Sequence, residues 1–259
     1  MKPLFLENEL PVDDLVRVGL WKDDKPMLPP EDLQAMLAGR RTSLLTLENV
    51  QADGFLIKRL DVKLSLHRSN SGWVSLQAHP IHHEIQPHPL LNERDMKLLS
   101  EGEISSLGKT MDAPNGKVQS LVFEYDEQTR EFISYSPSQV QAPDRVNGEL
   151  LDKKKKEAFQ YGESVELSDG TTFQHRASES KGIVSDRKAL VLSVLLDGGI
   201  SYLLIRGIRN LLNRNTPQKD EYTAGYNKAV EEMNIKVSTE RMSKFDTEEN
   251  RGNTRSRSR

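Results

Sequence analysis

The chain has 259 residues, of which 36% are hydrophobic and 29% charged, with no cysteine and a formal net charge of −3. The absence of cysteine excludes a disulfide-stabilised fold, a thiolate metal site and a cysteine nucleophile, and it fits a reducing, cytoplasmic location. Because residues 251–259 contain four arginines and no acid, residues 1–250 carry a net charge of −7, which argues against a broad phosphate-binding surface.

The first residues, MKPLFLENELPVDD, reach acidic residues and a proline after two or three apolar positions. A secretory signal needs a longer apolar region, so no export is expected. A short helix is expected in this N-terminal part of the chain.

Three segments resemble each other when they are aligned on Gly39, Gly102 and Gly162. In each, apolar residues before the glycine have helical spacing, and the glycine falls where a left-handed residue ends a helix. Asn92 and Asp152 can accept hydrogen bonds at two of the predicted helix starts, and a pair of prolines suits the first turn of the other. The repeat therefore predicts a short helix in each of the segments 29–47, 92–110 and 151–169.

After each glycine the apolar period changes to two, which indicates half-buried strands. In LDVKLSLH, residues 60–67, four aliphatic residues alternate with Asp61, Lys63, Ser65 and His67. The turn SNSG leads to a second strand, WVSLQAH, in a register whose paired positions sum to about 142, so His79 should lie opposite Lys63. The second copy has KVQSLVFEY and REFISY. The third has only ESVELS and TTFQHR around an Asp169-Gly170 turn, and we expect it to be truncated to two strands.

The segment AHPIHHEIQPHP, residues 78–89, contains four of the six histidines. His79, His82 and His83 have a spacing that would place three imidazoles on one side of a helix, as a zinc or nickel site requires. Three prolines oppose a helix, because a residue before proline avoids the helical region. We interpret the segment as an extended, solvated linker, with these histidines as weak metal candidates and no cofactor expected.

Residues 188–215, KALVLSVLLDGGISYLLIRGIRNLLNRN, form the most apolar stretch. Asp197 and two glycines interrupt it, so it is too short for a membrane span, and we predict a helical hairpin that bends at the glycines. An apolar stripe on its second helix comprises Ile200, Leu204, Ile208, Leu211 and Leu212. This stripe would belong to the core or a homo-oligomer interface, bind the groove of a protein partner, or lie on a membrane surface.

No glycine-rich phosphate loop, nucleophile elbow or zinc-binding helix motif occurs, so no catalytic residue is assigned. The run Lys153–Lys156 is interpreted as a solvated helix face. Beyond residue 215 a fraying helix through Tyr222 and Met233 should precede a disordered basic tail. Its arginines, Arg251, Arg255, Arg257 and Arg259, are weak candidates for nucleic-acid binding.

In chain order, the pieces MLAGRRTSLL, LDVKLSLHRSNSGWVSLQAHPI, LSEGE and QYGES resemble two adjoining families of unknown function. These families occur in multidomain proteins of bacterial conjugative transposons and related mobile elements. The resemblance covers roughly residues 8–175 and implies a mobile-element setting without an assigned activity.

The sequence thus predicts an α+β fold of helix-plus-meander units with a C-terminal helical hairpin and a disordered tail. The expected divisions are 1–87, 88–148, 149–186, 187–215 and 216–259. The expected function is a non-enzymatic accessory or scaffold protein of a mobile element, which binds a protein partner or itself. The alternatives are a nucleic-acid-associated accessory protein and an enzyme of unknown reaction.

Overall fold

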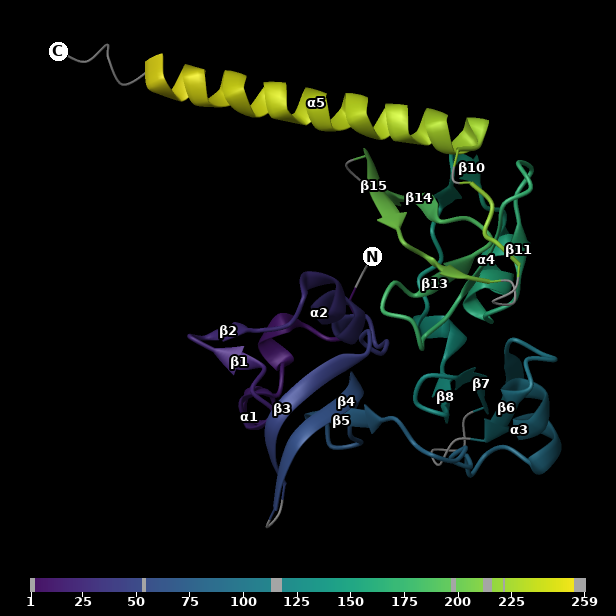
Figure 1. The fold of residues 1–259 in the computed structure, drawn as a ribbon. Coiled ribbons are helices and arrows are strands. Elements are labelled where there is room, and N and C mark those ends of the chain that lie inside the picture. The colour runs from purple at the N-terminus through teal and green to yellow at the C-terminus, as the bar shows by residue number, and fades with distance from the viewer. Residues whose placement is uncertain are drawn as a thin grey trace.

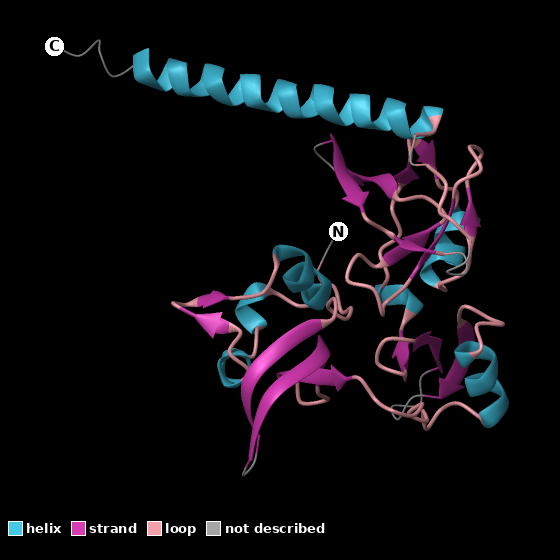
Figure 2. Ribbon diagram, viewed as in Figure 1, coloured by secondary structure: helices cyan, strands magenta, loops and turns pink. Residues whose placement is uncertain are grey.

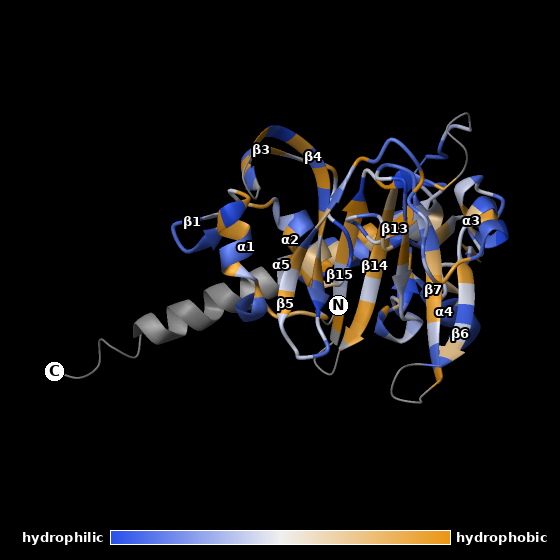
Figure 3. Ribbon diagram, turned by 90° about the horizontal axis from the view of Figure 1, so that it is seen from below, coloured by the Kyte–Doolittle hydropathy of each residue, from blue (hydrophilic) through white to orange (hydrophobic). Residues whose placement is uncertain are grey.

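The computed structural model describes residues 3–52, 55–112, 118–196, 199–211, 216–220 and 222–253. The fold is α+β, as predicted, with short helices packed against small sheets and a long C-terminal helix (Figures 1 and 2). Hydrophobic and hydrophilic residues alternate along many of the strands (Figure 3). This is the pattern of a sheet that packs one face against a core.

The first unit begins with a 3-10 turn, η1 (Glu7–Glu9), the helix α1 (Val12–Arg17), and the strand pair β1 (Trp21–Lys22) and β2 (Lys25–Pro26). The helix α2 (Pro30–Leu37) then leads to the meander β3 (Leu45–Ala52), β4 (Phe55–Arg68) and β5 (Val74–Pro80). The register of β4 and β5 is the predicted one, since Lys63 pairs with His79.

The second unit repeats this order with α3 (Glu93–Ser100) and the antiparallel strands β6 (Leu107–Asp112), β7 (Val118–Asp126) and β8 (Glu131–Tyr135). A second 3-10 turn, η2 (Pro137–Gln139), and a small hairpin of β9 (Arg145–Val146) and β10 (Glu149–Leu150) connect it to the third unit.

The third unit is complete, so the predicted truncation is wrong. It contains α4 (Lys153–Gln160) followed by β11 (Val165–Glu166), β12 (Thr172–His175) and β13 (Ile183–Ser185), which pair antiparallel in that order. The polar segment between β12 and β13 hid the third strand from the sequence pattern. A fourth strand, β16 (Arg209–Asn210), adds parallel to β13.

The predicted helix boundaries are confirmed. Gly39, Gly102 and Gly162 have φ values of +75°, +74° and +68°, in the left-handed region that glycine enters without a side-chain penalty. Asn92 accepts a hydrogen bond from the Asp95 amide at 2.8 Å, and Asp152 accepts one from the Lys155 amide at 2.7 Å. The start and end of these helices are therefore set locally.

The predicted helical hairpin at 188–215 is wrong, because this stretch forms two long antiparallel strands. These are β14 (Ala189–Leu196) and β15 (Gly199–Arg206), and they extend the β9–β10 hairpin into the sheet β10-β9-β14-β15. Apolar side chains fill both faces of β14: Leu190 and Leu192 join the core of the third unit, and Ala189 and Val191 join a smaller cluster. A strand covered on both faces has a continuous apolar sequence, which periodicity cannot distinguish from a buried helix.

The last helix, α5 (Ala224–Asn253), is longer than predicted and replaces much of the expected disordered tail. Its backbone includes the position of Arg251, whereas Arg255, Arg257 and Arg259 lie outside the described residues. None of the described helices is long and apolar enough to cross a membrane.

Candidate functional site

The candidate binding surface is formed by β15 and α5 at the C-terminal end of the described chain. Thr223 caps the start of α5: its hydroxyl accepts from the Tyr226 amide at 3.0 Å and donates to Asp169 at 2.6 Å. This cap fixes the helix start to the β11–β12 turn of the third unit.

α5 crosses the sheet in the order of its strands. Gly225 lies against the β9–β10 turn, where an added Cβ would come within 2.7 Å of the Asn147 carbonyl oxygen. Tyr226 and Ala229 are buried against Val191 of β14. One turn further, the Tyr202 hydroxyl of β15 donates to Glu232 at 3.3 Å. The first half of α5 is thus anchored across β14 and β15.

The second half of α5 continues past the edge of the sheet. Lys236 donates to the Ile200 carbonyl of β15, and the helix backbone runs on to Asn253 (Figure 1). At about 1.5 Å per residue, this part of the helix is about 25 Å long. Ile235 and Val237 are exposed there, with Ile235 61% accessible. A helix that leaves the body of the protein with exposed aliphatic residues can bind a partner through them.

β15 is the outer strand of its sheet. Among the described strands it pairs only with β14. The carbonyl of Arg206 at one end accepts from Lys181, which also donates to the Gly207 carbonyl at 3.0 Å, and the carbonyl of Ile200 at the other end accepts from Lys236. An edge strand with available backbone groups is a template for adding another strand.

The five residues predicted to form one apolar stripe are divided between different environments. Ile208 is buried in the third unit's core, and Leu204 packs in the cluster under α5. Ile200 and Leu211 are half-buried, and Leu212 lies outside the described residues. The helical spacing that united them does not apply to a strand. Among the described side chains of the hairpin, the exposed large apolar residues are instead Leu195 and Leu203, each 49% accessible.

The histidine segment follows β5, connects it to α3 and is exposed at most of its positions, and it also contacts the second unit. The amides of His82 and Gln86 donate to the carbonyls of Thr129 and Arg130, at 3.2 and 2.9 Å, so the segment lies along the β7–β8 turn. His88 meets the Phe123 ring edge-on, with centroids 5.1 Å apart. The linker therefore joins the first two units physically.

His79 and His82 both approach Glu131 of β8. His79 Nδ1 lies 3.1 Å from Oε2, and His82 Nε2 lies 3.4 Å from Oε1, whereas His83 is exposed. Arg41 also contacts Oε2, at 2.8 Å. Burial raises the pKa of Glu131, but the hydrogen bond from His79 and the charge of Arg41 lower it to about 2 overall. A guanidinium on the shared carboxylate opposes a cation there, and no group of three or more potential ligands within the described residues is arranged to hold a metal ion.

A buried ionic cluster, which the sequence analysis missed, continues from Glu131. Lys63 donates to both carboxylate oxygens of Asp126, at 3.1 and 3.0 Å, and to the Ser178 carbonyl at 2.8 Å. Arg41 contacts Asp126 at 3.2 Å and donates to Thr129 at 2.7 Å. Lys63 lies on the strand face that the alternation predicts to be exposed to solvent. The only sequence feature that set it apart is its register opposite His79. The cluster connects all three units.

The junction between the three units also contains a small cavity, lined in part by Arg40, Tyr135 and His175. Burial and the charge of Arg40 lower the pKa of His175 to about 3, so this imidazole is neutral and its Nδ1–H donates to the Gly182 carbonyl at 2.8 Å. Burial raises the pKa of Tyr135 above its usual value. The cavity volume is about 40 Å³, which suits a water-sized group and excludes a metabolite.

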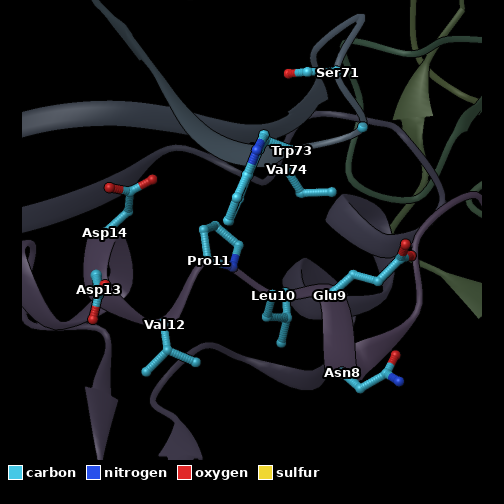
Figure 4. A pocket seen from close by; sticks show the side chains of 11 residues that line it. Asn8, Glu9, Leu10, Pro11, Val12, Asp13, Asp14, Ser71, Trp73 and Val74 are labelled. Carbon is cyan, nitrogen blue, oxygen red and sulfur yellow. The ribbon is translucent and has the colours of Figure 1, made fainter.

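An open groove lies at the opposite end of the chain, beside α1. Trp73, Pro11 and three acidic side chains line it (Figure 4). Two of these acids already have partners: Glu9 binds Arg68 at 2.9 Å, and Asp14 accepts from the Leu76 amide at 3.1 Å. Trp73 is 79% exposed.

The lysine run on α4 is largely neutralised. Lys155 binds Glu149 at 2.6 Å, Lys156 binds Asp144, and Lys153 lies 3.7 Å from Glu157. These pairs leave little free charge for a phosphate.

Comparison with known proteins identifies one region of the chain. Residues 5–90 match the model of a family described as a protein of unknown function, DUF4099. No curated protein and no solved structure matches the chain significantly. The matched region is the first helix-plus-meander unit with its histidine segment.

Proposed function

We propose that this protein is a non-enzymatic, cytoplasmic scaffold or accessory protein of a mobile genetic element, and that it binds a protein molecule through the outer edge of β15 and the part of α5 that continues past this edge. The observation that carries the proposal is the path of α5, which is anchored on β14 and β15 and then continues past the edge strand. A strand edge beside an exposed helix offers backbone hydrogen bonds and apolar contacts in one place.

The buried ionic cluster supports a scaffold role. Because Lys63, Arg41 and Asp126 are buried and pair across unit boundaries, separating the units would leave charges without partners. A fixed arrangement of units holds β15 and α5 in one orientation. The proposed mobile-element setting rests on the resemblance noted in the sequence; the family model covers residues 5–90 of that stretch and does not itself name a setting.

Affinity capture from cells that carry the native gene tests this proposal. The wild type is compared with a double variant, Ile235→Glu/Leu203→Glu, and with the control Leu56→Glu, which alters an equally exposed residue of β4. We expect a stoichiometric protein with the wild type and the control, and its loss with the double variant. Capture of the same protein by the wild type and both variants, or no capture by any of the three, contradicts the proposed surface.

Nucleic-acid association through the basic tail is the competing proposal, because α5 carries Arg251 to the far end of the projecting helix. It requires retention on DNA that depends on residues 245–259. With four contacts, the affinity should fall about a hundredfold between roughly 50 and 200 mM salt. Retention that does not change when the tail is removed eliminates this alternative.

A further inference from the structure

We propose that the molecule bound at the β15 edge is a second copy of this chain, paired β15 to β15 in antiparallel fashion about a two-fold axis at Leu203. This inference rests on the proposed function, because it assigns an occupant to the same surface. The paired sheet would contain two copies of β10-β9-β14-β15, with β15 at its centre.

The direction of the backbone groups on β15 follows from the neighbouring bonds. The amides of Asp144 and Asn147 donate to the Ser193 and Val191 carbonyls, so odd-numbered residues of β14 face β9 and even-numbered residues face β15. Even-numbered residues of β14 are paired with odd-numbered residues of β15, as Leu192 is with Leu203. The even-numbered residues of β15 therefore direct their amides and carbonyls outward.

A two-fold axis at Leu203 pairs these outward residues with each other. Tyr202 would lie opposite Leu204 of the second copy and exchange both backbone hydrogen bonds with it, and Ile200 would lie opposite Arg206. The carbonyls of Ile200 and Arg206 are the two that Lys236 and Lys181 contact. The backbone groups of the central residues are consequently available to pair first. When the full strand pairs, the two terminal carbonyls exchange their lysine donors for backbone amides of the second strand.

Leu203 supports this register. It is 49% exposed in the middle of β15, although the residues beside it on the same face, Leu192 and Ile205, are buried. On the two-fold axis it would occupy a non-hydrogen-bonded pair with itself, at a Cα separation of about 4.5 Å. The pairing thus covers the exposed leucine of the strand with an identical side chain.

The length of α5 fits the same arrangement. Strands lie about 4.8 Å apart, so the second copy's four strands would extend about 19 Å beyond β15. The part of α5 after Lys236 is about 25 Å long. The two-fold axis places the α5 helices of both copies on the same face of the paired sheet. The two helices would lie antiparallel to each other across the strands of the paired sheet. These strands have eight residues and are about 27 Å long. This length accommodates two helices side by side at the usual packing distance of about 8–10 Å.

The test uses the self-pairing of Leu203. The molar mass of the purified full chain is measured by light scattering over a wide range of concentration for the wild type, Leu203→Glu, Leu203→Lys, an equal mixture of these two variants, and Leu56→Glu. Thermal unfolding of each variant verifies folding. We expect a dimer for the wild type and Leu56→Glu, a dissociation constant raised at least about tenfold in either Leu203 variant, and recovery of the dimer in the mixture, where opposite charges meet.

A wild type that remains monomeric at every concentration overturns the inference, and so does a dimer that survives in both Leu203 variants or is not restored in the mixture. The affinity capture described above separates the two proposals. If the wild type is monomeric but captures another protein that the Ile235→Glu/Leu203→Glu variant does not, only the self-pairing fails. If neither occurs, the proposed function fails as well.

Discussion

Lys63 and Asp126 form a fully buried ion pair between two units of the repeat. The Lys63 ammonium lies 3.0 Å from Asp126 Oδ2, and each side chain is 1% exposed. The Ser178 carbonyl accepts a further hydrogen bond from Lys63, so the third unit takes part. Burying such a pair costs desolvation energy, and the attraction offsets this cost only while every partner is present.

Asp126→Ala should therefore lower the free energy of unfolding by about 3–5 kcal/mol, because it leaves Lys63 buried without a countercharge. Replacing both partners, in Lys63→Met/Asp126→Leu, should recover most of this loss, since the remaining Arg41 and Glu131 still balance each other. Urea unfolding of the three proteins measures the difference. A double variant as unstable as the single one would show that the pair contributes more than its charge balance.

Stability should depend on pH through His175. Burial and the charge of Arg40 lower its pKa from 6.5 to about 3 in the folded protein. The unfolded chain therefore takes up a proton first, and the contribution of the neutral imidazole is complete above pH 6.5 and is lost as the pH falls toward 3. The slope is about 1.4 kcal/mol per pH unit.

His175→Asn keeps a donor for the Gly182 carbonyl and removes the titration. Between pH 6.5, the ordinary pKa of histidine, and pH 4.5, the ordinary pKa of glutamate, the variant should lose less stability than the wild type. Parallel pH profiles for both proteins would contradict the assignment of a buried neutral imidazole.

The repeat provides a matched pair of glycine substitutions. Gly102 and Gly162 end equivalent helices with similar positive φ values, but only at Gly162 would an added Cβ meet a neighbour, the Tyr135 hydroxyl at 2.7 Å. Gly102→Ala should cost about 1–2 kcal/mol from backbone strain alone, and Gly162→Ala should cost clearly more. Thermal unfolding measures both, and equal losses would mean that Tyr135 moves aside.

Zinc should not bind to the histidine segment. Arg41 already contacts the carboxylate that His79 and His82 share, and His83 is exposed to solvent. Calorimetric titration of the untagged protein should show no zinc binding with a dissociation constant below about 10 μM. A zinc site in a protein needs at least three protein ligands, and a site that has them would bind more tightly than this. Tighter binding that is lost in His79→Ala would restore the metal interpretation.

Local signals predicted much of the fold. Glycines at helix ends, acceptors at helix starts and alternating strands predict α2, α3, α4 and the strands β4, β5, β7 and β8, because these features depend on a few adjacent residues. The register of β4 and β5 followed from the same alternation, and the structure pairs Lys63 with His79 as predicted.

Two errors have a common physical cause. β14 is covered on one face by the third unit and on the other by α5, so its apolar sequence lost the alternation that marks a half-buried strand. The sequence Asp197-Gly198 is a hairpin signal of the same kind as Asp169-Gly170, whereas the helical interpretation uses Gly198 and Gly199 as the bend of a helical hairpin.

The buried ionic cluster was inaccessible to the sequence for a different reason. Lys63, Asp126 and Ser178 are separated by 63 and 52 positions, and each lies in a locally ordinary polar context. Only the packing of one unit on another turns a solvent-facing strand residue such as Lys63 into a core residue. Long-range contacts of this kind leave no periodic trace.

The most direct test of the β15 surface is hydrogen–deuterium exchange at low and high protein concentration. The amides of Tyr202 and Leu204 face outward from the sheet, so they should exchange rapidly in dilute protein and slowly in concentrated protein, while peptides from β4 remain unchanged. Exchange in β15 that is equally fast at both concentrations would contradict the pairing of this strand with a second copy.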